Sequence, residues 1–411
     1  TTANDAITFN HSIDGTQSLT LESGSAAIIL DGAIGADAIL TGLSVNATGG
    51  STGTIQITDI GDDAGVGVNT GTVSIGNVDT SMLTLDGTIY KTDVAQTYTA
   101  ATGQNIDITG AATFTTTNDA IAFATSGVDL ENNGTTTINT GTGVGAVTFG
   151  GAIETNGGSN EILTITSGGG AVTFTGALGV TNSLGGLTVN SASGAGNITF
   201  SSTIGDAENA GVVGTTAIGN AATNDLNFNS TIYSFNGATT ITAKSGDTID
   251  LGAGAATQFL TSNDNITFAT GNIELANGSD LTVDTGAEGG NITIGEIDGA
   301  SQETVTLDAG TGTTSVGVIG SGTEIGVLTI GSSDNGGITL NGAITTDGAV
   351  TIDGPVTLAT GAVSVTTAND AITFNHSIDG GQTLTLSSGS AAITLNGAIT
   401  TDGAVTIDGP V

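Results

Sequence analysis

Aspartate and glutamate are the residues of this sequence whose side chains could most clearly do chemistry. Their densest group is Asp59-Ile60-Gly61-Asp62-Asp63. Hard oxygen ligands of this kind suit Ca²⁺. The spacing, however, matches neither an EF-hand loop nor the Gly-Gly-x-Gly-x-Asp repeat of calcium-binding β-rolls. We therefore predict that Asp59, Asp62 and Asp63 form a solvated corner, with a Ca²⁺ site as the weaker alternative. No other cofactor is expected.

The two histidines, His11 and His376, occupy the same place in two copies of a repeated phrase that lie far apart in the chain. This separation makes them poor candidates for a pair of metal ligands, and we predict exposed corner residues. The acids that recur in Asp-Gly pairs are explained by turn chemistry; they are Asp347, Asp353, Asp402 and Asp408. The three tyrosines are too scattered for a carbohydrate-binding platform.

Two residue types recur at fixed positions of the phrase and could form rows. Phenylalanine at the third position predicts an internal aromatic ladder; the residues are Phe9, Phe149, Phe174, Phe200, Phe228 and Phe374. Threonine at the second position could form a flat outward row that binds ice or another regular surface; the residues are Thr8, Thr148, Thr173, Thr199, Thr339, Thr373 and Thr394. The simpler interpretation is that threonine suits the outward positions of strands.

The charge balance restricts the possible partners. The net charge is −37, and Lys91 and Lys244 are the only lysine or arginine residues. Nucleic-acid binding needs many such residues, and so does docking on anionic membranes. A β-helical enzyme acting on acidic polysaccharides would need cationic subsites that two lysines cannot supply, so we predict that the chain is not an enzyme. No run of about 18 apolar residues is present, so no transmembrane helix is expected.

The elements that must position these residues are short repeated strands. The phrase Ile-Thr-Phe-Asn-His-Ser-Ile stands at Ile7–Ile13 and again at Ile372–Ile378. Looser copies follow an apolar-Thr-apolar pattern, with a corner of small or polar residues and then a further apolar residue. Such alternation predicts strands with one face in and one face out. Cysteine is absent, glycine accounts for 68 of 411 residues, and no helical period is visible.

Longer duplications indicate a repeat architecture. The stretch 1–15 equals 366–380, and Ile338–Val356 equals Ile393–Val411. Segments that begin alike follow one another at Ile338, Val356, Ile372 and Ile393. We therefore expect the unit from Ile338 to Ile393 to hold three turns of about 18 residues each. Wider spacings in the middle of the chain coincide with Gly/Ser/Asn-rich loops.

These observations favour one architecture over a sandwich or a propeller. We predict an all-β fold in which residues 1–411 form a single parallel β-solenoid, a right-handed β-helix by preference. Each coil would contain about three short strands in about 16–28 residues, with about 20 coils stacked about 4.8 Å apart. Because neither terminus has a polar cap, we expect a segment of a longer array or copies that associate end to end.

The Gly/Thr/Asn-rich phrase repeats, the absence of cysteine and the short turns resemble the shafts of filamentous-haemagglutinin-like adhesins and related giant bacterial surface proteins with β-strand repeats. The resemblance covers the whole chain as a style of repeat. It implies a secreted, surface-displayed, right-handed β-helical stalk. The expected function is therefore structural and extracellular, with neighbouring repeats or further copies as partners and no identifiable receptor. A binding module using threonine rows is the alternative, and a polysaccharide-degrading enzyme is less favoured.

Overall fold

The computed structural model describes residues 1–131, 133–158, 160–190, 193–300, 302–332 and 336–411. All regular structure in this part of the chain is β-strand, and none of it is helical, so no helix is long and apolar enough to cross a membrane. The strands pair in parallel and stack as a β-solenoid of about 16 turns. The predicted all-β fold of stacked parallel strands is confirmed, whereas the expected number of coils was too high. The right-handed sense stays a prediction.

The chain divides into two compact units, which are described separately. Unit 1 comprises residues 1–205 and 211–223, and unit 2 comprises 206–210 and 224–411. In both units a coil contributes strands to three walls in turn. Alternation of buried and part-exposed residues, as in Ile55-Gln56-Ile57, places the apolar side chains inside and the polar ones outside.

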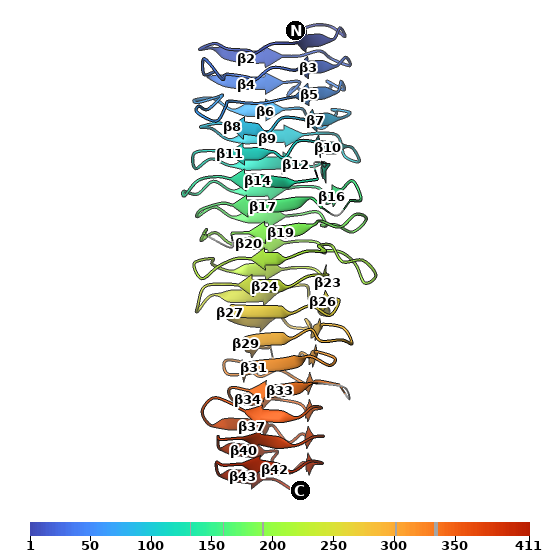
Figure 1. Ribbon diagram of the computed structural model, residues 1–411, viewed down its shortest axis with the longest axis vertical. Coiled ribbons are helices and arrows are strands. Elements are labelled where there is room, and N and C mark those ends of the chain that lie inside the picture. Colours follow the sequence, from blue (N-terminus) through green and yellow to red (C-terminus); the bar gives the residue numbers. More distant parts are fainter. Residues whose placement is uncertain (132, 159, 191–192, 301, 333–335) are drawn as a thin grey trace. The chain divides into compact units, whose positions relative to one another are not determined.

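The first wall of unit 1 is a seven-stranded sheet of β1 (Ile7–Phe9), β3 (Ile28–Leu30), β5 (Ile55–Ile57), β7 (Leu83–Leu85), β10 (Asn105–Ile108), β13 (Gly127–Leu130) and β16 (Ile153–Thr155). The second wall contains β8 (Ile89–Lys91), β11 (Thr113–Thr115), β14 (Thr135–Asn139), β17 (Ile162–Thr166), β19 (Gly186–Val189) and β21 (Thr216–Ile218). The third wall contains β2 (Ser18–Leu21), β4 (Gly42–Val45), β6 (Val73–Ile75), β9 (Gln96–Thr99), β12 (Ile121–Ala124), β15 (Val147–Phe149), β18 (Val172–Phe174) and β20 (Ile198–Phe200). In Figure 1, β3, β5 and β7 form one column of this unit, and β2, β4 and β6 form another.

The first wall of unit 2 is an eight-stranded sheet of β23 (Ile232–Phe235), β26 (Thr257–Thr261), β28 (Leu281–Asp284), β30 (Val305–Asp308), β32 (Leu328–Ile330), β35 (Val350–Ile352), β38 (Ile372–Phe374) and β41 (Ile393–Leu395). The second wall contains β24 (Thr239–Thr242), the first parts of β27 (Ile266–Leu275), β29 (Ile292–Asp298) and β31 (Thr313–Ile319), then β33 (Gly337–Leu340), β36 (Val356–Leu358), β39 (Ile378–Gly380) and β42 (Ile399–Thr401). The third wall contains β22 (Leu226–Phe228), β25 (Thr248–Leu251), the last parts of β27, β29 and β31, then β34 (Ile344–Thr346), β37 (Val363–Thr367), β40 (Leu384–Ser387) and β43 (Val405–Asp408).

The length of a coil varies because loops of different size join strands of constant register. The coil from Ile338 to its register partner Val356 is short, whereas the coil from Leu43 to its partner Val73 is much longer. The expected division of the long repeat into three coils is wrong. Its copies β33 and β41 lie on the second and first walls of unit 2. The step from Val356 to Ile372 therefore leads from one wall to another and does not complete a coil.

At the corner of the phrase, the copy at Ile28 has Gly32 at the position where the copy at Ile7 has His11. The contact between the two coils explains the glycine. A Cβ atom on Gly32 would lie 2.2 Å from the carbonyl carbon of His11, and one on Gly397 would lie 2.3 Å from that of His376. Real Cβ atoms do not approach other atoms so closely. The DGAI copy at Ile28 and the NGAI copy at Ile393 therefore need glycine because each crosses the backbone of an ITFNHSI copy.

The core is a closely packed column of aliphatic and aromatic side chains. In unit 1 the rings of Phe123, Phe149, Phe174 and Phe200 stack in sequence, with centroids 4.8–5.4 Å apart and planes within 5° of parallel. This confirms the aromatic ladder for three of the predicted phenylalanines. Phe9, however, is 37% exposed, because β1 is paired on one side only, with β3.

Candidate functional site

The predicted acidic corner is built by hydrogen bonds from the backbone. One carboxylate oxygen of Asp59 accepts N–H bonds of 2.8 and 2.9 Å from two residues of the next coil. One oxygen of Asp62 accepts N–H bonds of 2.9 and 2.5 Å from the second and third residues after it. Asp63 contributes its backbone carbonyl, which accepts a 2.9 Å bond from Lys91 Nζ. Backbone hydrogen bonds, within the turn for Asp62 and to the next coil for Asp59, therefore account for both carboxylates without a cation.

The two histidines belong to different units. His376 Nε2 lies 3.3 Å from Asp353 Oδ1, at a part-exposed corner of unit 2. His11 is exposed in unit 1. The tyrosines are fully buried members of the aromatic core: Tyr90 stacks on Phe114, and Tyr98 stacks on Phe123. A tyrosine surface for carbohydrate is therefore excluded for these residues.

A cluster of carboxylates that the acidic corner did not predict lies on the first wall of unit 1. Asp107 on β10 and Asp129 on β13 are register partners, so their side chains leave the same face one strand apart. Glu131 follows β13, and oxygen atoms of all three carboxylates lie within 4.8 Å of one another. Among the described residues this is the one group of three or more acidic or histidine side chains close enough to share a metal ion.

The electrostatics of this cluster follow from partial burial without a neighbouring base. Burial, followed by repulsion from Glu131 and Asp129, raises the pKa of Asp107 to about 6. The row continues to Glu154, which pairs in register with Asp129. Burial raises the pKa of Glu154, although backbone N–H groups of the next coil, with that of Asn182 at 2.7 Å, partly oppose the shift. Asn105 Nδ2 donates a 2.6 Å bond to Asp129.

Unit 2 carries a second acidic row on its third wall. Asp250, Glu274 and Asp298 are register partners on β25, β27 and β29. Burial and the neighbouring carboxylates raise the pKa values of Asp250 and Glu274. Stacked carboxylates of this kind can share a proton or accept a hard cation such as Ca²⁺.

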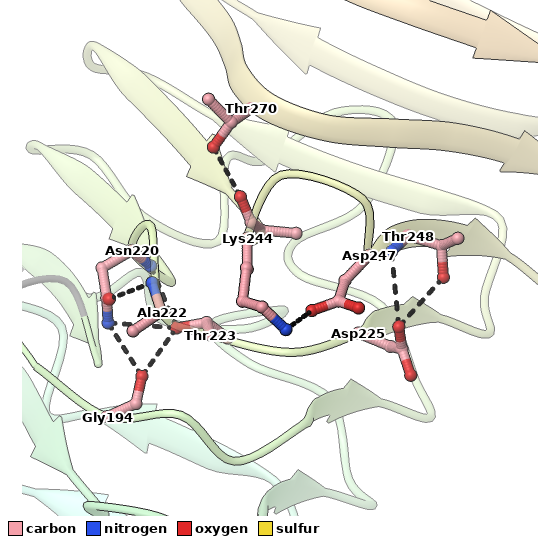
Figure 2. A network of polar contacts seen from close by, with 10 residues as sticks. Gly194, Asn220, Ala222, Thr223, Asp225, Lys244, Asp247, Thr248 and Thr270 are labelled. Atoms are coloured by element: carbon pink, nitrogen blue, oxygen red, sulfur yellow. Dashed lines mark hydrogen bonds and ion pairs between the residues drawn. The ribbon is translucent and has the colours of Figure 1, made fainter.

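Lysine does not neutralise either row. Figure 2 shows Lys244 extended toward Asp247, with Nζ 2.7 Å from Oδ2. In the same view, Asp225 Oδ1 accepts 3.3 Å bonds from the backbone and hydroxyl of Thr248. Lys91 binds a carbonyl rather than a carboxylate. Within the described part of the chain, no hydrogen bond or ion pair joins either lysine to a carboxylate of the two rows.

Threonine rows occur on several walls, but they are not the single predicted row. Thr148, Thr173 and Thr199 are consecutive partners on the third wall of unit 1. Thr8 faces Ile29, and Thr339 lies on the second wall of unit 2. The first wall of unit 2 carries a long uninterrupted row: Thr282, Thr306, Thr329, Thr351, Thr373 and Thr394.

Comparison with known proteins adds no assignment. No family model, curated protein or solved structure matches the chain. The walls themselves are therefore the basis for a functional proposal. The acidic rows could have been found in the sequence, because Asp107, Asp129 and Glu154 occupy outward strand positions, each one coil after the last. Recognising them required the register between neighbouring coils, which the sequence pattern did not supply in this part of the chain.

Proposed function

We propose that this chain is a structural segment of an extracellular fibre or shaft, of the kind carried by bacterial surface adhesins. The observation that supports it is the repetition of one coil design through both units. Identical residues serve on different walls: β33–β35 and β41–β43 share one sequence, yet begin on the second and first walls of unit 2. A catalyst needs one unique arrangement of side chains. A segment in which the same sequence can form different walls is better suited to a structural role.

In this proposal, the partners of the segment are coils of the same design. Parallel strands at the last coil of a stack offer unpaired N–H and C=O groups to another strand. Such coils can belong to the same chain or to a second copy. The acidic surface would keep neighbouring fibres apart, because like charges repel.

Negative-stain electron microscopy and analytical ultracentrifugation test the structural role. We expect extended particles, with a frictional ratio well above that of a compact protein of 39.5 kDa. Compact, round particles would contradict the proposal. Turnover of any member of a polysaccharide panel by the purified chain, lost on replacing Asp107 and Asp129 by asparagine, would favour the enzymatic alternative.

One observation favours a second candidate, a surface-binding role for the first wall of unit 2. The hydroxyl groups of its six-threonine row have no hydrogen-bond partner among the described residues. Hydroxyls repeated at the strand spacing of about 4.8 Å could match a regular lattice such as ice. Thermal hysteresis that Thr351→Lys abolishes and Thr173→Lys preserves would support this role. Absence of hysteresis and of ice shaping would dismiss it.

A further inference from the structure

Two stretches of the chain repeat the same coil design and differ at one informative position. Leu83-Thr-Leu-Asp-Gly-Thr-Ile-Tyr-Lys aligns with Leu226-Asn-Phe-Asn-Ser-Thr-Ile-Tyr-Ser, so Lys91 corresponds to Ser234. The structural equivalence is supported by the tyrosines. Tyr90 and Tyr233 each accept, on the hydroxyl oxygen, a backbone N–H bond from the residue three positions earlier.

The turn of the preceding coil is also repeated. Asp62 and Asp206 follow Ile-Gly in both stretches, and each carboxylate accepts N–H bonds from the second and third residues after it. Each aspartate also donates its own N–H to the carbonyl three residues on, at 3.1 and 2.9 Å. The two turns therefore have the same backbone design, and Asp63 corresponds to Ala207.

The ammonium group at this turn is present in unit 1 and missing in unit 2. In unit 1, Lys91 Nζ donates a 2.9 Å bond to the carbonyl of Asp63. In unit 2, Ser234 is too short to take this place. Its side chain has no hydrogen-bond partner among the described residues, although the residue is only 8% exposed. The carbonyl of Ala207 likewise accepts no bond from the described residues.

A groove of about 670 Å³ lies where the lysine side chain would be, within unit 2. Its volume falls in the range of small-molecule sites. Its lining includes the aliphatic side chain of Leu260 and the carboxylates of Glu208, Asp284 and Glu288. Ala207 and Ser234 also line it. The only lysine or arginine of unit 2 is Lys244, which is paired with Asp247.

We propose that this groove binds the side chain of a lysine from a partner polypeptide. The ammonium group would donate to the Ala207 carbonyl and the Ser234 hydroxyl, in the place that Lys91 takes at the equivalent turn. Leu260 would contact the aliphatic arm, and Glu208, Asp284 and Glu288 would supply the opposite charge. This site does not depend on the structural role proposed above.

The test is a titration of the full ¹⁵N-labelled chain with the peptide acetyl-Gly-Lys-Gly-amide, followed by NMR. The matched ligand has norleucine in place of lysine, which keeps the aliphatic arm and removes the charge. We expect saturable shifts at the amides of Ala207, Glu208 and Ser234 with an affinity in the millimolar range, and none at the equivalent turn around Asp62. Glu208→Gln should weaken binding about threefold, since one of three carboxylates is lost.

The decisive variant is Ser234→Lys, which supplies the ammonium group from within the chain. It should weaken peptide binding by about tenfold or more, whereas Thr173→Lys, an outward lysine on another wall, should leave binding unchanged. Retention of the wild-type circular-dichroism spectrum would show that both variants fold. Equal binding of the norleucine peptide, shifts outside the groove only, or undiminished binding by a folded Ser234→Lys variant would overturn the proposal.

Discussion

The acidic row of unit 1 should destabilise the folded protein at neutral pH, so removing one of its charges should stabilise it. The change with the clearest effect is Asp107→Asn, because Asp107 is half-buried and lies against Asp129 and Glu131. Asparagine has nearly the same shape as the protonated acid. The variant should therefore resemble the wild type in which Asp107 carries its proton.

The magnitude follows from the pKa of Asp107, which rises from 3.8 to about 6 on folding. One pKa unit corresponds to about 1.4 kcal/mol, so the full shift would amount to about 3 kcal/mol. Solvent screens a part-exposed carboxylate, and we expect about 1 kcal/mol. Because the folded pKa is the higher one, protonation favours the folded state. This stabilisation is complete below pH 3.8 and is lost as the pH rises through 6.

Urea unfolding at pH 7.5 and pH 4, in low salt, measures the effect. The unfolding midpoint of Asp107→Asn should exceed that of the wild type at pH 7.5, and this advantage should become clearly smaller at pH 4, where the folded wild type holds the proton. Asp37→Asn removes the same charge from an exposed loop and should change the midpoint little at either pH. The reasoning fails if Asp107→Asn is less stable than the wild type at pH 7.5, if its advantage at pH 4 is as large as at pH 7.5, or if Asp37→Asn gains as much.

Three further substitutions probe the fold by the same denaturation assay. Gly32→Ala should lower the free energy of unfolding by about 2 kcal/mol or more, as overpacking a core does, because the added Cβ would overlap the His11 backbone. Gly15→Ala, which has open space around it, should lower it far less. Phe149→Ala should lower the free energy of unfolding by about 3–5 kcal/mol, because its ring stacks between two others. If Phe9→Ala, which removes an exposed ring, lowers it by a similar amount, the stacked column of rings is contradicted. Asp62→Ala should lower the free energy of unfolding by about 1 kcal/mol, because it removes the acceptor for two turn amides. The decrease should be equal in calcium and in chelator. A decrease seen only in calcium would support a cation site at this turn.

Local pattern was enough to predict the strands and their inward faces, because alternation with a two-residue period is a property of each strand alone. The trio Val147, Thr148, Phe149 shows this: the outer residues are buried and the threonine is part-exposed. Coil boundaries were harder to predict. Both Ile338 and Ile393 begin the same sequence, and nothing within it states which wall it will join. Loop length decides the wall, and loops of varied length carry little periodic signal.

The candidate sites were missed for the same reason. Asp107 and Asp129 are distant in the sequence, and only the register of β10 with β13 makes them neighbours. The acids around Asp59 are close in sequence and were therefore predicted as a candidate site. The carboxylate oxygens of Asp59 and Asp62 instead accept hydrogen bonds from backbone N–H groups. In a solenoid, side chains that can act together are one coil apart. Sequence proximity is therefore a poor guide to chemistry until the register is known.

The repeated design also shows where specific function could arise. A wall whose residues can be exchanged with those of another wall cannot carry a unique site by its repeats alone. Specificity must come from departures from the repeat, and the change from Lys91 to Ser234 is such a departure. One copy of the turn satisfies its carbonyl with an ammonium group from the chain, and the other leaves carbonyl, hydroxyl and carboxylates facing a groove. The repeated backbone keeps the geometry fixed while a single side chain converts a filled position into an open one.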